Sequence, residues 1–113
     1  MEQCANSILM IKPVGFRYNE LTAVNNYYQQ VLNNITPEQV QVRALREFDE
    51  FVAVLAKAGV EVFVYEDTKT LDTPDSIFPN NWVSFHADGR VCLYPMFAPN
   101  RRLERRLDIV SSL

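Results

Sequence analysis

The chain has 113 residues, of which 48% are hydrophobic and 22% are charged. This length suffices for one small domain with a single core, and the composition is that of a globular rather than a disordered chain. Eleven basic against fourteen acidic residues give a net charge of -3, so the chain as a whole does not attract nucleic acid or an anionic membrane. The sequence contains no long apolar run and no basic-then-apolar start. It therefore predicts neither a membrane span nor a signal peptide, and we expect a cytoplasmic protein.

The first predicted element is a strand over residues 7–12 (SILMIK), which Pro13 stops. A short, nearly continuous apolar run is typical of a strand covered on both faces, and it predicts a central strand rather than an edge strand. Thr22 can then cap a helix over residues 23–32, although its adjacent asparagines are weak helix formers.

The clearest helix begins after Thr36, which forms a capping-box pattern with Gln39, and Pro37 occupies the first helical position. Apolar residues recur at steps of three and four, and Gly59 stands just past the end. Residues 60–65 (VEVFVY) are β-branched and aromatic, which predicts a strand. Strand, helices and strand in this order predict a crossover unit with two parallel strands, so the fold class is α/β.

A hairpin is predicted where residues 82–86 and 90–94 flank Asp88 and Gly89, a strong tight-turn signal. After Pro95, we expect a terminal helix capped by Asn100. Its apolar stripe would consist of Leu103, Leu107 and Val110.

Basic residues gather on this terminal helix. We interpret them as a solvated face, with Glu104 and Asp108 offering local ion pairs. A nucleic-acid helix is disfavoured, because supporting basic or stacking residues are missing elsewhere. The four arginines are Arg101, Arg102, Arg105 and Arg106.

Residues 73–82 (TPDSIFPNNW) form the densest polar and aromatic stretch of the chain. Each of its two prolines fixes its own φ and pushes the preceding residue towards extended geometry, which predicts a stiff, non-helical segment. Asp75 only accepts hydrogen bonds, whereas Asn80 and Asn81 each offer both an acceptor and donors. The three could bind a small ligand, but the same residue types are ordinary turn chemistry, and on residue types alone a turn is favoured.

The sequence predicts neither a metal site nor a cofactor. The acidic residues of the segment 66–72 fit no metal-binding spacing and are interpreted as part of a solvated linker. Cys4 and Cys92 form no CxxC motif, and we interpret them as a free terminal thiol and a buried strand thiol. His86 has no evident catalytic neighbour in the sequence, so a structural role is favoured for it.

Two stretches carry a family resemblance. Residues 74–82 (PDSIFPNNW), followed by a hairpin and by residues 94–104 (YPMFAPNRRLE), resemble the N-terminal part of the guanidino-group modifying superfamily. Its members include arginine deiminases, amidinotransferases and dimethylarginine dimethylaminohydrolases. Residues 10–14 (MIKPV) and 22–26 (TAVNN) are similar to the amidinotransferase-like branch that includes citrulline-utilisation hydrolases. The resemblance covers essentially the whole chain.

This resemblance implies a five-bladed α/β propeller, the pentein fold, of which residues 1–113 would form about one blade and part of the next in a single domain. It also implies a cysteine nucleophile and a histidine acid/base, both located beyond residue 113 in the family's order. We therefore expect no catalytic residue in this chain, which would be the N-terminal third of an enzyme and inactive alone.

The resemblance further implies a small-molecule amino-acid substrate, with Asp75 at its α-amino end. Asn80 and Asn81 stand where dimethylarginine hydrolases have a glutamate and an aspartate against the guanidinium, and Arg101 matches an arginine that meets the substrate carboxylate. The expected substrate-binding residues are Asp75, Phe78, Asn80, Asn81 and Arg101.

Two neutral amides give up the charge-assisted bonds that carboxylates make to a guanidinium, which suggests a neutral ureido substrate such as citrulline. The parent reaction would be hydrolysis or amidino transfer. The alternative from another class is a free-standing, non-catalytic α/β module that binds a small ligand or a protein. As a fragment, the chain is also expected to self-associate through exposed edges.

Overall fold

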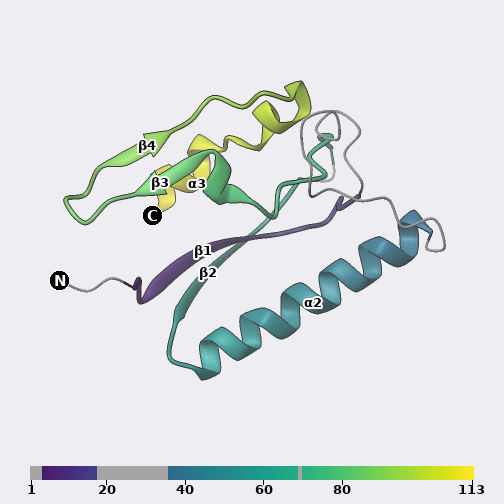
Figure 1. Cartoon of the computed structure of the whole chain (residues 1–113), viewed down its shortest axis with the longest axis horizontal. Coiled ribbons are helices and arrows are strands. Elements are labelled where there is room, and N and C mark those ends of the chain that lie inside the picture. The colour runs from purple at the N-terminus through teal and green to yellow at the C-terminus, as the bar shows by residue number, and fades with distance from the viewer. Residues whose placement is uncertain (1–3, 18–35, 69) are drawn as a thin grey trace.

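The computed structural model describes residues 4–17, 36–68 and 70–113, and arranges them in layers (Figure 1). A long helix lies on one side of a parallel pair of strands, and an antiparallel hairpin with a short helix lies on the other. In chain order the elements are β1 (Ser7–Lys12), α2 (Pro37–Lys57), β2 (Glu61–Glu66), η1 (Pro79–Asn81), β3 (Val83–Phe85), β4 (Val91–Leu93), η2 (Pro99–Glu104) and α3 (Leu107–Ser112). These helices and small sheets agree with the predicted α/β class.

The start of α2 confirms the predicted cap. The Thr36 hydroxyl accepts from the Gln39 backbone N–H at 3.2 Å, and the Gln39 side chain accepts from the Thr36 N–H at 3.0 Å. Two N–H groups that the first helical turn leaves unpaired are satisfied in this way. The helix ends before Gly59, whose φ of 90° suits a residue without a side chain. Its buried face centres on Phe48, which is 4% exposed.

Strand β1 pairs with β2 in parallel, from Ser7 opposite Glu61 to Lys12 opposite Glu66, so the predicted crossover is confirmed. Both faces of β1 are covered: Met10 lines a groove with residues of α2, and Leu9 packs against the hairpin core. The expectation of a central strand is wrong for the described residues, because there β1 pairs only with β2. A helix and a hairpin, rather than neighbouring strands, account for its apolar run.

The core that joins the layers is built around Trp82, which is 1% exposed. Val83 and Met96 complete this buried cluster, and Leu9 of β1 and Val110 of α3 pack against it. The predicted hairpin is confirmed, with β3 antiparallel to β4. Its turn contains Gly89 at a φ of 87°, a conformation that favours glycine.

The C-terminal region differs from the predicted single helix. Asn100 is not a cap, because η2 begins at Pro99 after Ala98 and the Asn100 side chain is buried. The backbone is extended at Arg105 and Arg106, so α3 starts only at Leu107.

This break shifts the helical phase and removes the predicted apolar stripe. Leu103 and Leu107 are 43% and 61% exposed, whereas Ile109 is 1% exposed. Val110 alone of the predicted stripe packs on the core.

The stretch around the two prolines is also less extended than predicted. Pro79 begins the 3-10 turn η1, a position that proline tolerates because its missing N–H has no partner in a first turn. The helix expected over residues 23–32 lies outside the described residues. Within the part of the chain that the structure describes, no helix is long and apolar enough to cross a membrane.

Candidate functional site

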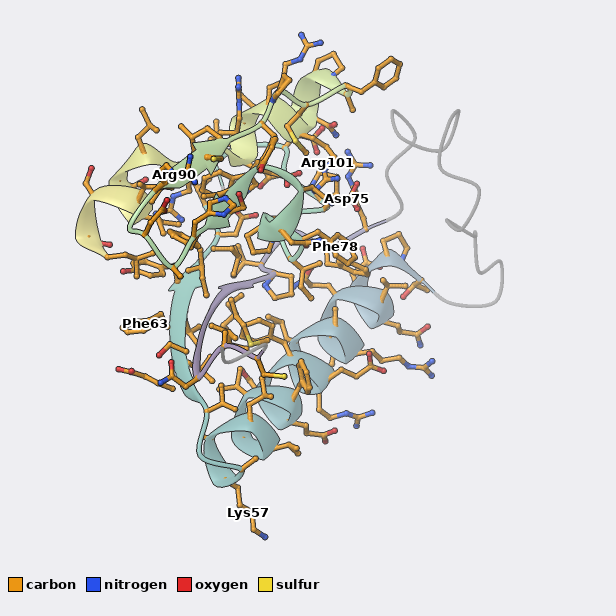
Figure 2. All side chains as sticks on the ribbon, turned by 60° about the vertical axis from the view of Figure 1, so that its left-hand side comes forward. Lys57, Phe63, Asp75, Phe78, Arg90 and Arg101 are labelled. Carbon is orange, nitrogen blue, oxygen red and sulfur yellow. The ribbon has the colours of Figure 1, made fainter. Side chains whose placement is uncertain are left out.

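The guanidinium of Arg101 joins several of the predicted site residues (Figure 2). Its Nη1 donates to the Asn81 side-chain oxygen Oδ1 at 2.9 Å. Its Nη2 lies 3.4 Å from the backbone oxygens of both Asp75 and Phe78. Arg101 comes from η2, while the other three residues belong to the 73–82 stretch and η1. The contact therefore ties two segments, far apart in the sequence, into one surface.

Glu104 holds the other edge of the same guanidinium. Its two carboxylate oxygens accept from Nε and Nη2 of Arg101, each at 3.0 Å. The Glu104 side chain is 1% exposed and that of Arg101 13% exposed, so the pair is largely removed from water. Such a two-point contact fixes the plane of the guanidinium as well as its position.

Burial raises the pKa of Glu104 above its usual value. The hydrogen bonds and charge of Arg101 oppose this effect, while the negative charges of Asp75 and Asp67 add to it. The carboxylate is therefore held in a site where ionisation is costly and where Arg101 compensates only in part.

The segment leading into the site is anchored rather than a solvated linker. Asp67 is 8% exposed and Thr73 is 3% exposed, and the Thr73 hydroxyl donates to the Asp67 carboxylate at 2.5 Å. Asp75 and Ser76 are buried beside them. The alternation of apolar and polar residues carried no signal for this buried polar row, because a hydrogen bond rather than an apolar contact joins Thr73 to Asp67.

Asp72 immediately precedes Thr73, is exposed, and contacts two other segments of the chain. It accepts from Nη2 of Arg17 at 2.6 Å and from the Asn100 amide at 3.3 Å. The Arg17 hydrogen bond is the main cause that lowers the pKa of Asp72. Asn100, expected as a helix cap, instead links η2 to the 66–73 segment.

The structure brings four of the five predicted site residues together around one guanidinium. Asp75 is buried at 9% exposed, whereas Phe78 is 45% exposed and Asn81 is an exposed residue. Asn80 is exposed as well, but its side chain makes no hydrogen bond within the described residues. Sequence reasoning missed one feature of the site, the burial of Glu104. It predicted that Glu104 forms a local ion pair, but it did not predict that this carboxylate is buried.

Two other C-terminal arginines, Arg102 and Arg106, also contact the protein, so the predicted face is not purely solvated. Arg102 donates through Nε to the backbone oxygen of Met96 at 2.9 Å, and Arg106 donates through Nη1 to that of Glu66 at 2.7 Å. The predicted local pair between Arg106 and Asp108 is present at 2.8 Å.

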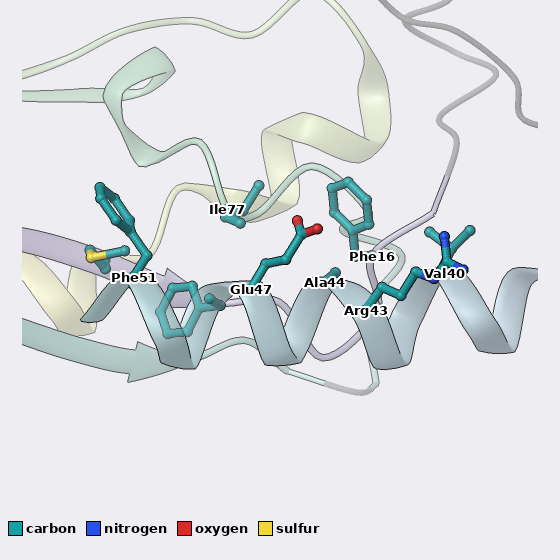
Figure 3. A pocket seen from close by; sticks show the side chains of 9 residues that line it. Phe16, Val40, Arg43, Ala44, Glu47, Phe51 and Ile77 are labelled. Atoms are coloured by element: carbon teal, nitrogen blue, oxygen red, sulfur yellow. The ribbon is translucent and has the colours of Figure 1, made fainter. Parts of the chain in front are cut away.

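A separate groove of about 550 Å³ lies beside α2 (Figure 3). Its lining is mainly apolar and includes Phe16, Phe51 and Ile77, with Arg43 and Glu47 as its charged residues. None of the five predicted site residues lines it. Ile77 is the link between groove and site, because it belongs to the same 73–82 stretch.

No hydrogen bond joins Cys4, Cys92 or His86 to the Arg101 site within the described residues. Cys4 is exposed, Cys92 is partly buried on β4, and both are free thiols. His86 Nε2 lies 2.9 Å from the Ser84 hydroxyl. Within the described residues, no group of three His, Cys, Asp or Glu side chains could hold a metal ion.

Comparison with the profiles of known protein families matches residues 12–113 to the family described as N,N dimethylarginine dimethylhydrolase, eukaryotic. The match begins at the last residue of β1 and includes the whole of the Arg101 site. Searches of curated proteins and of solved structures give no match.

Proposed function

Since the chain belongs to the N,N dimethylarginine dimethylhydrolase family, we propose that it forms one wall of a substrate site for an amino acid with a ureido or guanidino group. The family is one of guanidino-group hydrolases, within the guanidino-group modifying superfamily. The wall consists of Asp75, Phe78, Asn80 and Asn81, with Arg101 joining the segments that carry them.

One observation carries this proposal: the Arg101 guanidinium gathers Asn81 and the backbone of Asp75 and Phe78 into one surface. Arg101 is itself held by Glu104. A surface whose polar groups are fixed before binding loses less entropy when a ligand arrives, which favours a binding role over that of a connecting turn.

The residue types of the wall favour a neutral ureido group over a guanidinium. Asn80 and Asn81 carry no charge, so they give up the charge-assisted bonds that a cationic group makes with carboxylates. They also avoid burying carboxylates against a group that cannot neutralise them. Citrulline is accordingly the proposed substrate type, with arginine or a derivative as the competing one.

We further propose that the chemistry is supplied by a cysteine nucleophile outside this chain. Its thiolate would attack the ureido or guanidino carbon, an amine or ammonia would leave, and water would then hydrolyse the thiol adduct. Transfer of the group to a second amine is the variant. The described residues would thus belong to a pentein propeller, as about one blade and part of the next.

Turnover by the full-length gene product tests the proposal. We expect release of ammonia or an amine from L-citrulline at a higher kcat/KM than from L-arginine, and loss of this preference in the Asn81→Ala variant. A strong arginine preference that survives Asn81→Ala would refute the ureido assignment. No turnover of either compound would favour the non-catalytic binding module.

A further inference from the structure

We propose that the groove beside α2 is a second ligand site, which binds an apolar L-α-amino acid such as phenylalanine or leucine. The apolar residues of the groove receive the side chain of this ligand. Arg43 pairs with its carboxylate, and Glu47 pairs with its ammonium group. The site is separate from the surface around Arg101 and does not depend on the function proposed for that surface.

The groove has the size and the lining of a small-molecule site. Its volume of about 550 Å³ falls within the range of roughly 300–1,000 Å³ that is typical of such sites. Its apolar lining includes Met10, Phe16, Phe48, Phe51 and Ile77. Phe51 is 54% exposed, so part of this apolar lining is open to water. A ligand that covers it with an apolar side chain gains from the hydrophobic effect.

Two opposite charges lie on the α2 side of this groove. Arg43 and Glu47 are four residues apart on α2, so their side chains share one face of the helix. Both are exposed, and neither makes a hydrogen bond or an ion pair with a described residue. In Figure 3 the Glu47 carboxylate points between Phe16 and Ile77, whereas Arg43 extends along the helix towards Val40. The two charges are therefore directed to different parts of the groove rather than to each other.

An apolar lining with one cation and one anion is complementary to a zwitterion with an apolar body. A ligand carboxylate accepts from the guanidinium of Arg43, and a ligand ammonium group donates to the carboxylate of Glu47. A ligand with a single charge pairs with only one of the two residues. An amino acid with a polar side chain loses hydrogen bonds to water that the apolar lining does not replace. Citrulline is therefore disfavoured in the groove, although it carries the same zwitterionic group.

Chemical-shift titration of the 113-residue chain with L-phenylalanine tests the site. We expect saturable shifts of the backbone amides of Ala44 and Phe48, which line the groove, and no such shifts with L-citrulline. The dissociation constant should be millimolar, because exposed ion pairs contribute little and a small ligand loses translational freedom. N-acetyl-L-phenylalanine lacks the ammonium group and L-phenylalaninamide lacks the carboxylate, so each should bind about threefold more weakly.

Two variants assign each ligand charge to its residue. Arg43→Gln should weaken the binding of L-phenylalanine about threefold but should not weaken that of L-phenylalaninamide, which has no carboxylate. Glu47→Gln should weaken the binding of L-phenylalanine about threefold but should not weaken that of N-acetyl-L-phenylalanine. Arg46→Gln and Glu50→Gln are the matched controls, since they remove the same charges from exposed positions of α2 that do not line the groove. Far-UV circular dichroism checks that each variant is folded.

Three results would overturn the inference. The first is the absence of a saturable shift at Ala44 and Phe48 with L-phenylalanine. The second is equally tight binding of the uncharged N-acetyl-L-phenylalaninamide, or an equal loss of affinity in the control variants, since the groove would then be only an apolar surface. The third is a shift of the same amides with protein concentration alone, which would assign the groove to a second copy of the chain. The binding of citrulline at the surface around Arg101 is tested separately.

Discussion

Replacing Glu104 with alanine should destabilise the fold through the loss of one buried ion pair. The carboxylate is 1% exposed and accepts two hydrogen bonds of 3.0 Å from Arg101, which is 13% exposed. Removing one partner of a buried pair typically costs 3–5 kcal/mol. We expect about 3 kcal/mol, because Arg101 keeps its bonds to Asn81 and to backbone oxygens. In a domain of this size, that cost lowers Tm by roughly 12 °C.

Glu104→Gln separates the charge of this residue from its shape. Burial raises the pKa of Glu104 above its usual value of 4.5. At a pH between the usual pKa and the raised pKa, Glu104 is protonated in the folded state and ionised in the unfolded state. The stability from this group is complete below its usual pKa and is lost as pH rises through the folded value. Glutamine does not titrate. The stability advantage of the unmodified chain over Glu104→Gln should therefore shrink as the pH rises above 4.5, the usual pKa of the group.

Urea denaturation followed by circular dichroism at several pH values measures both effects. Glu50→Ala on the exposed face of α2 is the control, with an expected change below about 0.5 kcal/mol. The reasoning is refuted if Glu104→Ala lies within about 1 kcal/mol of the unmodified chain, or if the advantage over Glu104→Gln grows with pH.

Three other predictions concern the core, the helix cap and association. Trp82→Ala should cost about 3–5 kcal/mol in urea denaturation, because the Trp82 cluster packs against Leu9 of β1 and Val110 of α3. Phe85→Ala should cost under about 1 kcal/mol, because Phe85 is 48% exposed. Thr36→Ala removes the cap of α2 and should cost about 1 kcal/mol by the same assay, while Thr36→Ser should retain most of the stability. The exposed apolar residues of α2 and the hairpin predict an apparent mass that rises with concentration in light scattering, and a constant monomer mass would contradict this.

Local signals in the sequence predicted the elements that depend on local physics. The capping box of Thr36 and Gln39 predicted the start of α2, and the Asp88-Gly89 pair predicted the hairpin, because both depend on a few adjacent residues. The predicted end of α2 at Gly59 was also correct, since the residue needs a positive φ. Family resemblance indicated the site residues, and the family match confirms the family.

The predictions were wrong where contacts between residues far apart in the sequence determine the local structure. Asn100 has a typical capping side chain, but its amide is taken by Asp72, which is 28 residues away in the sequence. Arg106 is one of the extended residues between η2 and α3, where a single helix was predicted, and its side chain donates to the backbone oxygen of Glu66, 40 residues away in the sequence. The spacing of apolar residues in a sequence does not indicate such long-range contacts. The burial of Glu104 also depends on packing between distant segments.

Chemical-shift mapping of the 113-residue chain with L-citrulline tests the central claim most directly, because it locates the binding surface. The account predicts that the backbone amide signals of Asn81 and Phe78 and the side-chain amide signals of Asn81 shift saturably, while the backbone amide signals of Ala44 and Phe48 in the groove beside α2 do not. Shifts confined to the groove residues, or no saturable shift at Asn81, would contradict it.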